Sequence, residues 1–189
     1  MAKTKQPVDI HVYQMKLTLE DIKPPIWRRI QVTSATSLYR LHKILQVVMG
    51  WDDYHLHEFI INDMHYGEPS PDYMFKMKND KTVKVGQAVS EEGAKFTYIY
   101  DFGDSWNHKI LVEKILPIEP DKKYPICLKG KRACPPEDCG GVGGYYEFLE
   151  AIQNPNNPEH EDMLEWVGGS FDPEAFDLDK INRRLMEIR

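Results

Sequence analysis

Residues 96–116 constrain the fold most, because two strand-like runs are separated there by one short polar turn. The two runs are residues 96–101 and residues 106–116, and they are joined through Asp101-Phe102-Gly103-Asp104-Ser105. This composition is typical of a turn, in which we expect Gly103 to take a positive φ and Asp or Ser side chains to cap backbone amides. The segment therefore predicts an antiparallel hairpin with carboxylates at its tip.

The first thirty residues predict another hairpin. Residues 10–19 alternate apolar and polar positions, as a half-buried strand does, and residues 26–32 resume that alternation. Pro24-Pro25 between them forces an extended turn. We expect Ile26, Arg28, Ile30 and Val32 to share one face of the second strand.

Residues 38–50 predict a helix. Thr36 or Ser37 is available as the N-cap, and Gly50 is placed to end the helix. The apolar positions that recur at helical spacing are Leu38, Leu41, Ile44, Leu45 and Val48. His42 lies off this apolar stripe, so we expect it to face solvent.

The middle of the chain gives weaker signals. Residues 55–61 predict a strand that turns at Asn62-Asp63, and residues 82–85 predict one short further strand. Residues 117–136 are rich in loop-forming residues, and we expect no regular element there.

Helical signals are concentrated at the C-terminal end. Residues 144–152 predict one helix, Asn157-Pro158 predicts the start of a second, and Asp172-Pro173 predicts the start of a third. Strands come first and helices last, which favours an α+β fold with an antiparallel sheet. We expect one domain over residues 1–189, divided into a flexible start (1–9), a sheet-rich part (10–140) and a helical part (141–189).

Length and composition limit the class of protein. The chain has 189 residues, and its hydrophobic content of 41% argues against disorder. No apolar run approaches the roughly 20 residues that span a bilayer, and the start lacks a secretory signal, so we expect a cytoplasmic protein without a membrane partner. Three cysteines are an odd number for a reducing compartment, which favours free thiols or metal ligands over disulfides.

Charge is unevenly distributed along the chain. The net charge is −6, yet residues 1–50 hold eight Lys and Arg against three acidic residues, and residues 147–179 hold ten acidic residues without Lys or Arg. The simpler interpretation is a set of solvated faces that attract each other within the fold. The alternative is a basic nucleic-acid face at Arg28, Arg29, Arg40 and Lys43, although the net charge predicts weak DNA binding or none.

Histidine and cysteine residues predict a candidate zinc site. His55 and His57 are two apart on an expected strand, and Cys134 and Cys139 flank a stiff Pro-Pro segment that is followed by Gly-Gly. A Cys₂His₂ site from His57, His108, Cys134 and Cys139 is chemically sensible, with His55 as an alternate ligand. The simpler interpretation is structural, because His57 and His108 each begin the apolar face of a strand.

Carboxylates near the expected hairpin turn are candidates for acid and base chemistry. Asp101, Asp104 and Glu58 can act with His108 if the fold brings them together. Asp101-Phe102-Gly103 is not a kinase magnesium motif, because no glycine-rich nucleotide loop, strand lysine or catalytic loop accompanies it.

Six motifs in order give the chain a family resemblance between about residues 13 and 185. The chain resembles the plasmid pRiA4b open-reading-frame-three-like family, whose members occur on plasmids and as passengers of insertion sequences and whose function is uncharacterised. The resemblance implies that the recurrent His, Asp and Cys positions of the family are His57, Asp101, Asp104, His108, Cys134 and Cys139. Its motifs are Pro25-Ile26-Trp27-Arg28-Arg29-Ile30, the helix that ends in Gly50-Trp51, His55-Leu56-His57-Glu58-Phe59, Tyr100 to His108, Arg132 to Gly141, and Phe171-Asp172-Pro173-Glu174.

Three functions follow from these observations. The first is a cytoplasmic α+β member of that family with a metal-binding or polar site. The second is a nucleic-acid-binding accessory protein of mobile elements, and the third is a metal-dependent hydrolase that uses Asp and Glu as acid and base groups. An open metal coordination position favours the third, and salt-sensitive DNA binding favours the second.

Overall fold

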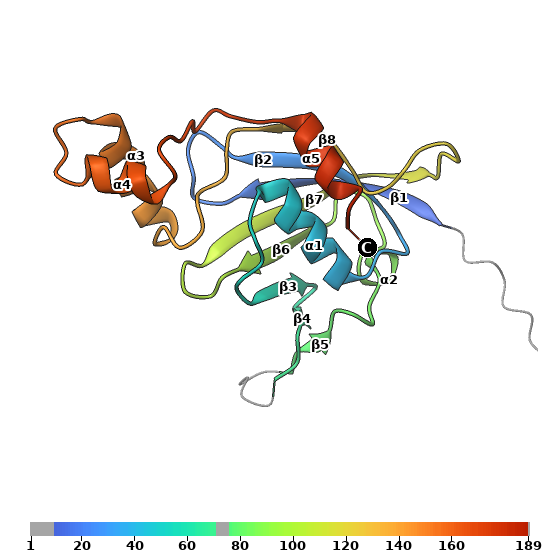
Figure 1. The fold of residues 1–189 in the computed structure, drawn as a ribbon. Helices are drawn as coiled ribbons and strands as arrows, with labels where there is room; N and C mark the ends of the chain where they lie inside the picture. Colours follow the sequence, from blue (N-terminus) through green and yellow to red (C-terminus); the bar gives the residue numbers. More distant parts are fainter. Residues whose placement is uncertain (1–9, 71–75, 189) are drawn as a thin grey trace, which may run out of the picture.

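One eight-stranded sheet forms the centre of the molecule (Figure 1). The computed structural model describes residues 10–70 and 76–188. The strand order is β5-β4-β3-β6-β7-β1-β2-β8, and every neighbouring pair is antiparallel except β4 with β5. The strands are β1 (His11–Leu19), β2 (Trp27–Thr33), β3 (His57–Ile61), β4 (Met64–Gly67), β5 (Lys78–Asn79), β6 (Lys95–Tyr100), β7 (Trp106–Pro117) and β8 (Ile126–Lys131). The structure thus has the predicted α+β fold.

Both predicted hairpins are present. β1 pairs with β2 from Val12↔Thr33 to Thr18↔Trp27, and β6 pairs with β7 from Lys95↔Leu111 to Tyr100↔Trp106. β1 also pairs with β7, which joins the two hairpins into one sheet. The alternation seen in the sequence reflects this arrangement, because one face of each strand points into the core.

Helix α1 (Leu38–Met49) covers one face of the sheet (Figure 1). The Ser37 side chain accepts a hydrogen bond from the backbone N–H of Arg40, and Gly50 ends the helix with φ 93°. Both ends therefore lie where the sequence predicts them. The five apolar residues of the predicted stripe are all buried against the sheet.

Two central segments differ from the prediction. Residues 82–85 do not form a strand: Lys84 makes only an isolated bridge with Ser37, and a short helix, α2 (Val85–Ala88), follows. Conversely, β8 lies in the segment predicted as loop and pairs with β2. In β8 only Cys127 is buried, so its local signal is weak, and the strand forms because β2 offers it an open edge.

The C-terminal helices take two positions. Helix α3 (Gly141–Gln153) and helix α4 (His160–Trp166) pack together at one end of the sheet, whereas α5 (Leu178–Leu185) contacts α1 and β8 (Figure 1). The predicted third helix start is wrong, because the Asp172 side chain caps a single turn at Glu174 and α5 begins only after its N-cap, Asp177. The start of α4 also lies later than predicted, after its N-cap Glu159.

One hydrophobic cluster includes residues of the sheet, of α1, of α3 and of α5. None of the described helices is long and apolar enough to cross a membrane. The predicted flexible start, residues 1–9, lies outside the described residues.

Candidate functional site

A histidine and two carboxylates converge where β3 begins and β6 ends. His57 pairs with Tyr100 in the sheet, so the residues just before β3 lie beside those just after β6, and the Asp101 N–H donates to the Leu56 carbonyl. Nε2 of His55 lies 3.7 Å from Oδ2 of Asp101 and 3.0 Å from Oδ1 of Asp138. We call His55, Asp101 and Asp138 the triad.

The triad atoms are grouped closely enough to be candidate metal ligands. All three lie within 4.8 Å of one another, and in the described part of the chain this is the only such group of His, Cys, Asp or Glu. Ligand atoms about 2.1 Å from one ion and about 90–110° apart lie about 3.0–3.4 Å from each other. The 3.0 Å contact between His55 and Asp138 fits this spacing, whereas the 3.7 Å contact between His55 and Asp101 is wider, so ion binding requires a small movement of a side chain. Nε2 of His55 is buried, and its 3.0 Å contact with Asp138 does not have the geometry of a hydrogen bond. This nitrogen is therefore available to a ligand that also contacts Asp138.

Backbone geometry aims the two carboxylates of the triad. Asp101 has φ 55° and Asp138 has φ 58°, both in the left-handed region that Asp tolerates better than most residues. Oδ1 of Asp101 accepts a hydrogen bond from the Gly103 N–H at 2.9 Å, which leaves Oδ2 toward His55. The prediction for Gly103 is wrong, since the positive φ angles of this turn belong to Asp101 and Ser105.

The loop that carries Asp138 is fixed to the sheet and to α1. The Trp51 indole N–H donates to the Pro135 carbonyl at 2.9 Å, and the Asp52 N–H donates to Glu137 at 3.1 Å. The Tyr100 hydroxyl also donates to Glu137. Burial and this carboxylate raise the pKa of Tyr100, so the hydroxyl stays protonated. These bonds hold the loop on the N-terminal side of Asp138, whose own side chain is 66% exposed.

A second polar cluster lies between α1 and β3. The rings of His42 and His57 are stacked with centroids 3.5 Å apart and planes 4° apart. Nε2 of His42 lies 2.6 Å from Oδ1 of Asp53, and Nε2 of His57 lies 2.8 Å from Oδ2 of Asp80. His42 is 1% exposed, so the prediction that it faces solvent is wrong.

Burial keeps His42 neutral, and its hydrogen-bond partners fix which ring nitrogen carries the proton. Burial keeps the pKa of Tyr98 well above its usual range, so the hydroxyl donates to Nδ1 of His42 and accepts from Gln46. Nε2 of His42 must then carry the proton that points to Asp53. Burial lowers the pKa of His42 to about 4. Burial would raise the pKa of Asp53, but hydrogen bonds from His42 and Lys43 bring it to about 2.

His57 uses one ring nitrogen in a hydrogen bond within the fold, whereas His42 uses both. Asp80 is 1% exposed and holds Nε2 of His57, while the other carboxylate oxygen, Oδ1, is buried without a hydrogen-bond partner among the described residues. Nδ1 is the remaining ring nitrogen of His57. His57 lines a cavity of about 190 Å³. The other residues that line this cavity are Tyr39, His42, Lys43, Asp53, His55, Leu56 and Glu68.

The predicted Cys₂His₂ group is not assembled. His57 binds Asp80, and His108 is fully buried, with Nδ1 3.0 Å from the Trp106 carbonyl and a pKa lowered to about 4 by burial. The Cys134 thiol donates to Met49 and accepts from Arg28. Burial raises the pKa of Cys139 to about 12, so this thiol is protonated in the metal-free protein. Of the predicted metal residues, only the alternate His55 lies in the triad.

Of the predicted acid and base groups, the structure brings only Asp101 into the triad. The Glu58 side chain bonds to His65, because Glu58 and His57 are adjacent on β3 and so point to opposite faces of the sheet. Asp104 accepts a hydrogen bond from the Gly140 N–H and thereby links the hairpin turn to the start of α3.

The predicted basic face is used within the fold. Arg28 is 2% exposed and its guanidinium donates to the carbonyls of Val48, Trp27, Lys131 and Arg132, so it cannot reach a phosphate. Arg29 pairs with Glu113, Arg40 donates to the Ile188 carbonyl, and Lys43 pairs with Asp53. The assignment of Arg28 to a nucleic-acid site is therefore wrong.

Comparisons with known proteins place the chain in a family. Residues 11–180 match the model of the plasmid pRiA4b ORF-3-like protein family. The chain belongs to this family. A curated relative, "Uncharacterized protein y4hQ" of Sinorhizobium fredii, is 37% identical over 179 residues, which are 94% of this chain and 92% of the relative. The crystal structure of a protein of unknown function, MM3350, from Methanosarcina mazei is 42% identical, with a TM-score of 0.83 over 91% of this chain and 98% of that one.

This chain and the Methanosarcina mazei protein share a fold, and neither relative has a stated function that would identify the site. Sequence reasoning missed Asp138, Asp53 and Asp80, and it assigned His42 to solvent. The sequence did carry one signal for Asp138, since it lies inside the Cys-Pro-Pro-Glu-Asp-Cys motif. No comparable signal marks Asp53 or Asp80.

Proposed function

We propose that the triad of His55, Asp101 and Asp138 binds a divalent metal ion and that the protein is a metal-dependent hydrolase. The observation that carries the proposal is the convergence of three ligand atoms, one of them a buried imidazole nitrogen without a hydrogen-bond partner among the described residues. Three segments of the chain contribute one ligand each, and the fold positions all three.

The donor set supports hydrolytic chemistry. One imidazole and two carboxylates suit Zn²⁺ or Mn²⁺, and three protein ligands leave coordination positions open. A metal ion in such a site lowers the pKa of bound water and polarises a carbonyl or phosphoryl oxygen. The chain itself supplies the ligands, the hydrogen bond from Gly103 that orients Asp101, and the fixed loop that presents Asp138.

His57 is the best placed acid and base group. It lines the same 190 Å³ cavity as His55, and Asp80 orients its ring through Nε2, so Nδ1 is left to exchange a proton. His42 is less suited, because both of its nitrogens are already used by Tyr98 and Asp53.

Metal analysis and calorimetry test this function. Protein purified without chelators should contain Zn²⁺ or Mn²⁺, or bind either ion with about 1:1 stoichiometry in a titration. His55→Ala and Asp138→Asn should each weaken binding more than tenfold, whereas Cys134→Ser and Cys139→Ser should leave it unchanged. Loss of binding in the cysteine variants alone would transfer the site to the Cys₂His₂ group.

Hydrolysis is tested with activated model substrates. The metal-loaded protein should cleave a p-nitrophenyl ester or a bis-p-nitrophenyl phosphodiester faster than the metal-free protein. His57→Asn should lower that rate while metal affinity stays unchanged, because His57 is not a ligand in this proposal. A metal-loaded protein that cleaves neither substrate class above background would contradict the hydrolase assignment.

A further inference from the structure

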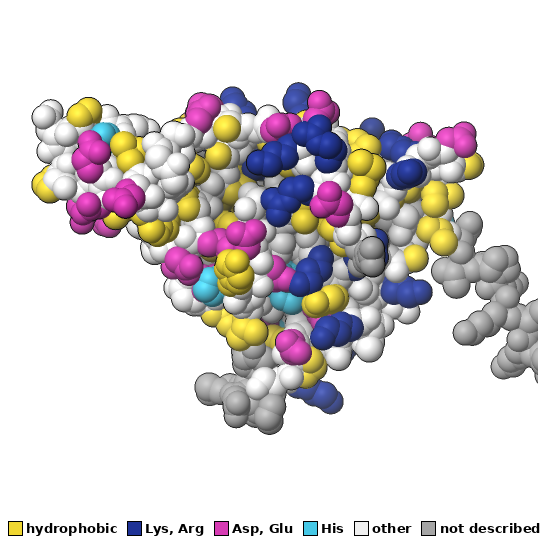
Figure 2. All heavy atoms as spheres, viewed as in Figure 1, with side chains coloured by type: hydrophobic (Ala, Val, Ile, Leu, Met, Phe, Trp, Pro, Cys, Tyr) yellow, Lys and Arg dark blue, Asp and Glu magenta, His cyan; other side chains and the backbone are white. Residues whose placement is uncertain are grey.

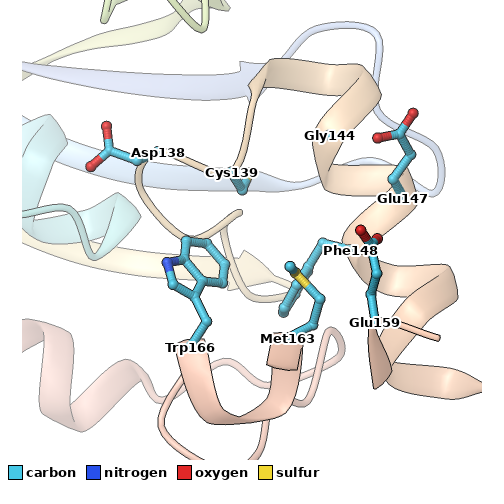
Figure 3. Close-up of a pocket in the computed structure, with 8 residues that line it drawn as sticks. All are labelled: Asp138, Cys139, Gly144, Glu147, Phe148, Glu159, Met163 and Trp166. Atoms are coloured by element: carbon cyan, nitrogen blue, oxygen red, sulfur yellow. The ribbon is translucent and has the colours of Figure 1, made fainter. Parts of the chain in front are cut away.

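A second cavity lies between the loop that carries Asp138 and Cys139 and the two helices α3 and α4 (Figure 3). Its volume is about 350 Å³, which is within the size range of small-molecule sites. Asp138 belongs to this cavity and to the triad. A molecule bound in the cavity therefore lies next to the proposed metal site.

The cavity has an aromatic and apolar floor. Phe148, Met163 and Trp166 form it, with the rings of Phe148 and Trp166 in edge contact at 5.7 Å between centroids. The Trp166 side chain is 47% exposed, which is high for an indole and leaves its ring accessible to a ligand. Figure 3 shows Trp166 on one side of the cavity and the carboxylates of Glu147 and Glu159 on the other.

The charge of the cavity is entirely negative. The eight described residues that line it include Asp138, Glu147 and Glu159 and no Lys or Arg. Residues 141–166, which include α3 and α4, hold six acidic residues and no Lys or Arg, and Figure 2 shows acidic side chains without basic ones at this end of the molecule. Carboxylates and an accessible indole ring on opposite sides of one cavity form an environment that attracts an organic cation through ion pairing and cation–π contact.

We propose that the α3–α4 cavity binds the cationic end of the substrate, an alkylammonium or guanidinium group on an aliphatic chain. The aliphatic chain packs on Met163 and Phe148, and the cation lies between Glu147, Glu159 and the Trp166 ring. An anionic ligand is excluded by the carboxylates, and a neutral apolar ligand would desolvate them without compensation. This inference rests on the proposed function in one respect, which is that the bond to be hydrolysed lies at the triad.

The experiment uses cadaverine as the alkylammonium probe, agmatine as the guanidinium probe and n-pentanol as the neutral match. Each is titrated into the metal-free full-length protein, with binding followed by tryptophan fluorescence and by calorimetry. One or both cations should bind saturably, at least tenfold more tightly than n-pentanol. The tighter of the two cations identifies the preferred group.

Matched variants locate the site. Glu147→Gln with Glu159→Gln should weaken cation binding at least fivefold, and Trp166→Phe should remove most of the fluorescence change. Glu161→Gln with Glu165→Gln removes the same charge from α4 outside the cavity and should change binding less than twofold. Equal losses in the two double variants, or equal binding of n-pentanol, would overturn the inference.

The outcome is independent of the metal. Cation binding should persist in His55→Ala, because His55 does not line this cavity. Cation binding by a wild-type protein that binds neither Zn²⁺ nor Mn²⁺ would support the cavity while contradicting the proposed function. Metal binding at the triad without cation binding would contradict the cavity alone.

Discussion

His42 and His108 are two histidines that the fold keeps neutral. Burial is the main cause in both cases, and it lowers the pKa of each to about 4 from an ordinary value of 6.5. Neutral imidazole suits their partners, because His42 accepts from Tyr98 and His108 donates to a backbone carbonyl. Protonation of either ring would place a charge in the core.

These two histidines predict a loss of stability in acid. A histidine whose pKa is lower in the folded state takes up a proton more readily when the protein is unfolded. The resulting loss of folding stability is absent above pH 6.5 and grows as the pH falls toward 4. The difference between a pKa of 6.5 in the unfolded state and about 4 in the folded state corresponds to a loss of on the order of 3 kcal/mol of folding free energy per histidine below pH 4. Thermal unfolding followed from pH 7 to pH 4 should show the decline, and His108→Gln should flatten it. An unchanged slope in that variant would contradict the assignment.

The backbone at the start of helix α3 lies very close to the loop that ends at Cys139. A Cβ on Gly144 would lie 1.9 Å from the Cys139 carbonyl oxygen, whereas a Cβ on Gly143 would meet nothing within 4 Å. The same region carries the loop of Asp138 and the cavity between α3 and α4. Glycine at position 144 therefore fixes how closely the helix approaches the candidate site.

Two alanine substitutions test this element. Gly143→Ala should be neutral or stabilise by up to about 1 kcal/mol, because alanine favours the helix. Gly144→Ala should destabilise by about 1–3 kcal/mol or more, because the helix must move away from Cys139. Urea denaturation of both variants measures the difference. Equal stability of the two would show that the close approach is not maintained in solution.

The triad brings together three segments that are far apart in the chain. Metal binding there is therefore expected to affect the stability of the whole molecule. The proposed ligands lie just before β3, just after β6 and in the loop before α3. An ion bound only by the folded state stabilises it by mass action, by about 2.7 kcal/mol at a hundredfold excess over the dissociation constant.

Thermal unfolding with and without metal tests this coupling. Zn²⁺ or Mn²⁺ should raise the Tm of the protein by several degrees, and the rise should disappear in Asp138→Asn. The isosteric variant Asp104→Asn is a suitable control, since Asp104 lies outside the triad, and it should retain the rise. A rise of the same size in Asp138→Asn would place the ion elsewhere.

Much of the fold follows from local patterns in the sequence. The β6/β7 hairpin, the β1/β2 hairpin and both ends of α1 depend on alternation, turn residues and caps, which act within a few residues of each other. The same reasoning missed β8, because that strand has one buried residue and depends on pairing with β2. It also misplaced the positive φ of the hairpin turn, which Asp101 and Ser105 adopt in place of Gly103.

The candidate site was decided mainly by tertiary structure. The sequence by itself determined that His55, Asp101 and the Cys-Pro-Pro-Glu-Asp-Cys loop carry ligand-type side chains, and that the chain belongs with the pRiA4b family through its ordered motifs. It did not determine that Asp138, rather than Cys134 or Cys139, would meet His55, nor that His42 would stack on His57. The reason is physical: a ligand set depends on distances between segments that are remote in the chain, and those distances are fixed only when the strands are in register and the loop is bonded to the sheet.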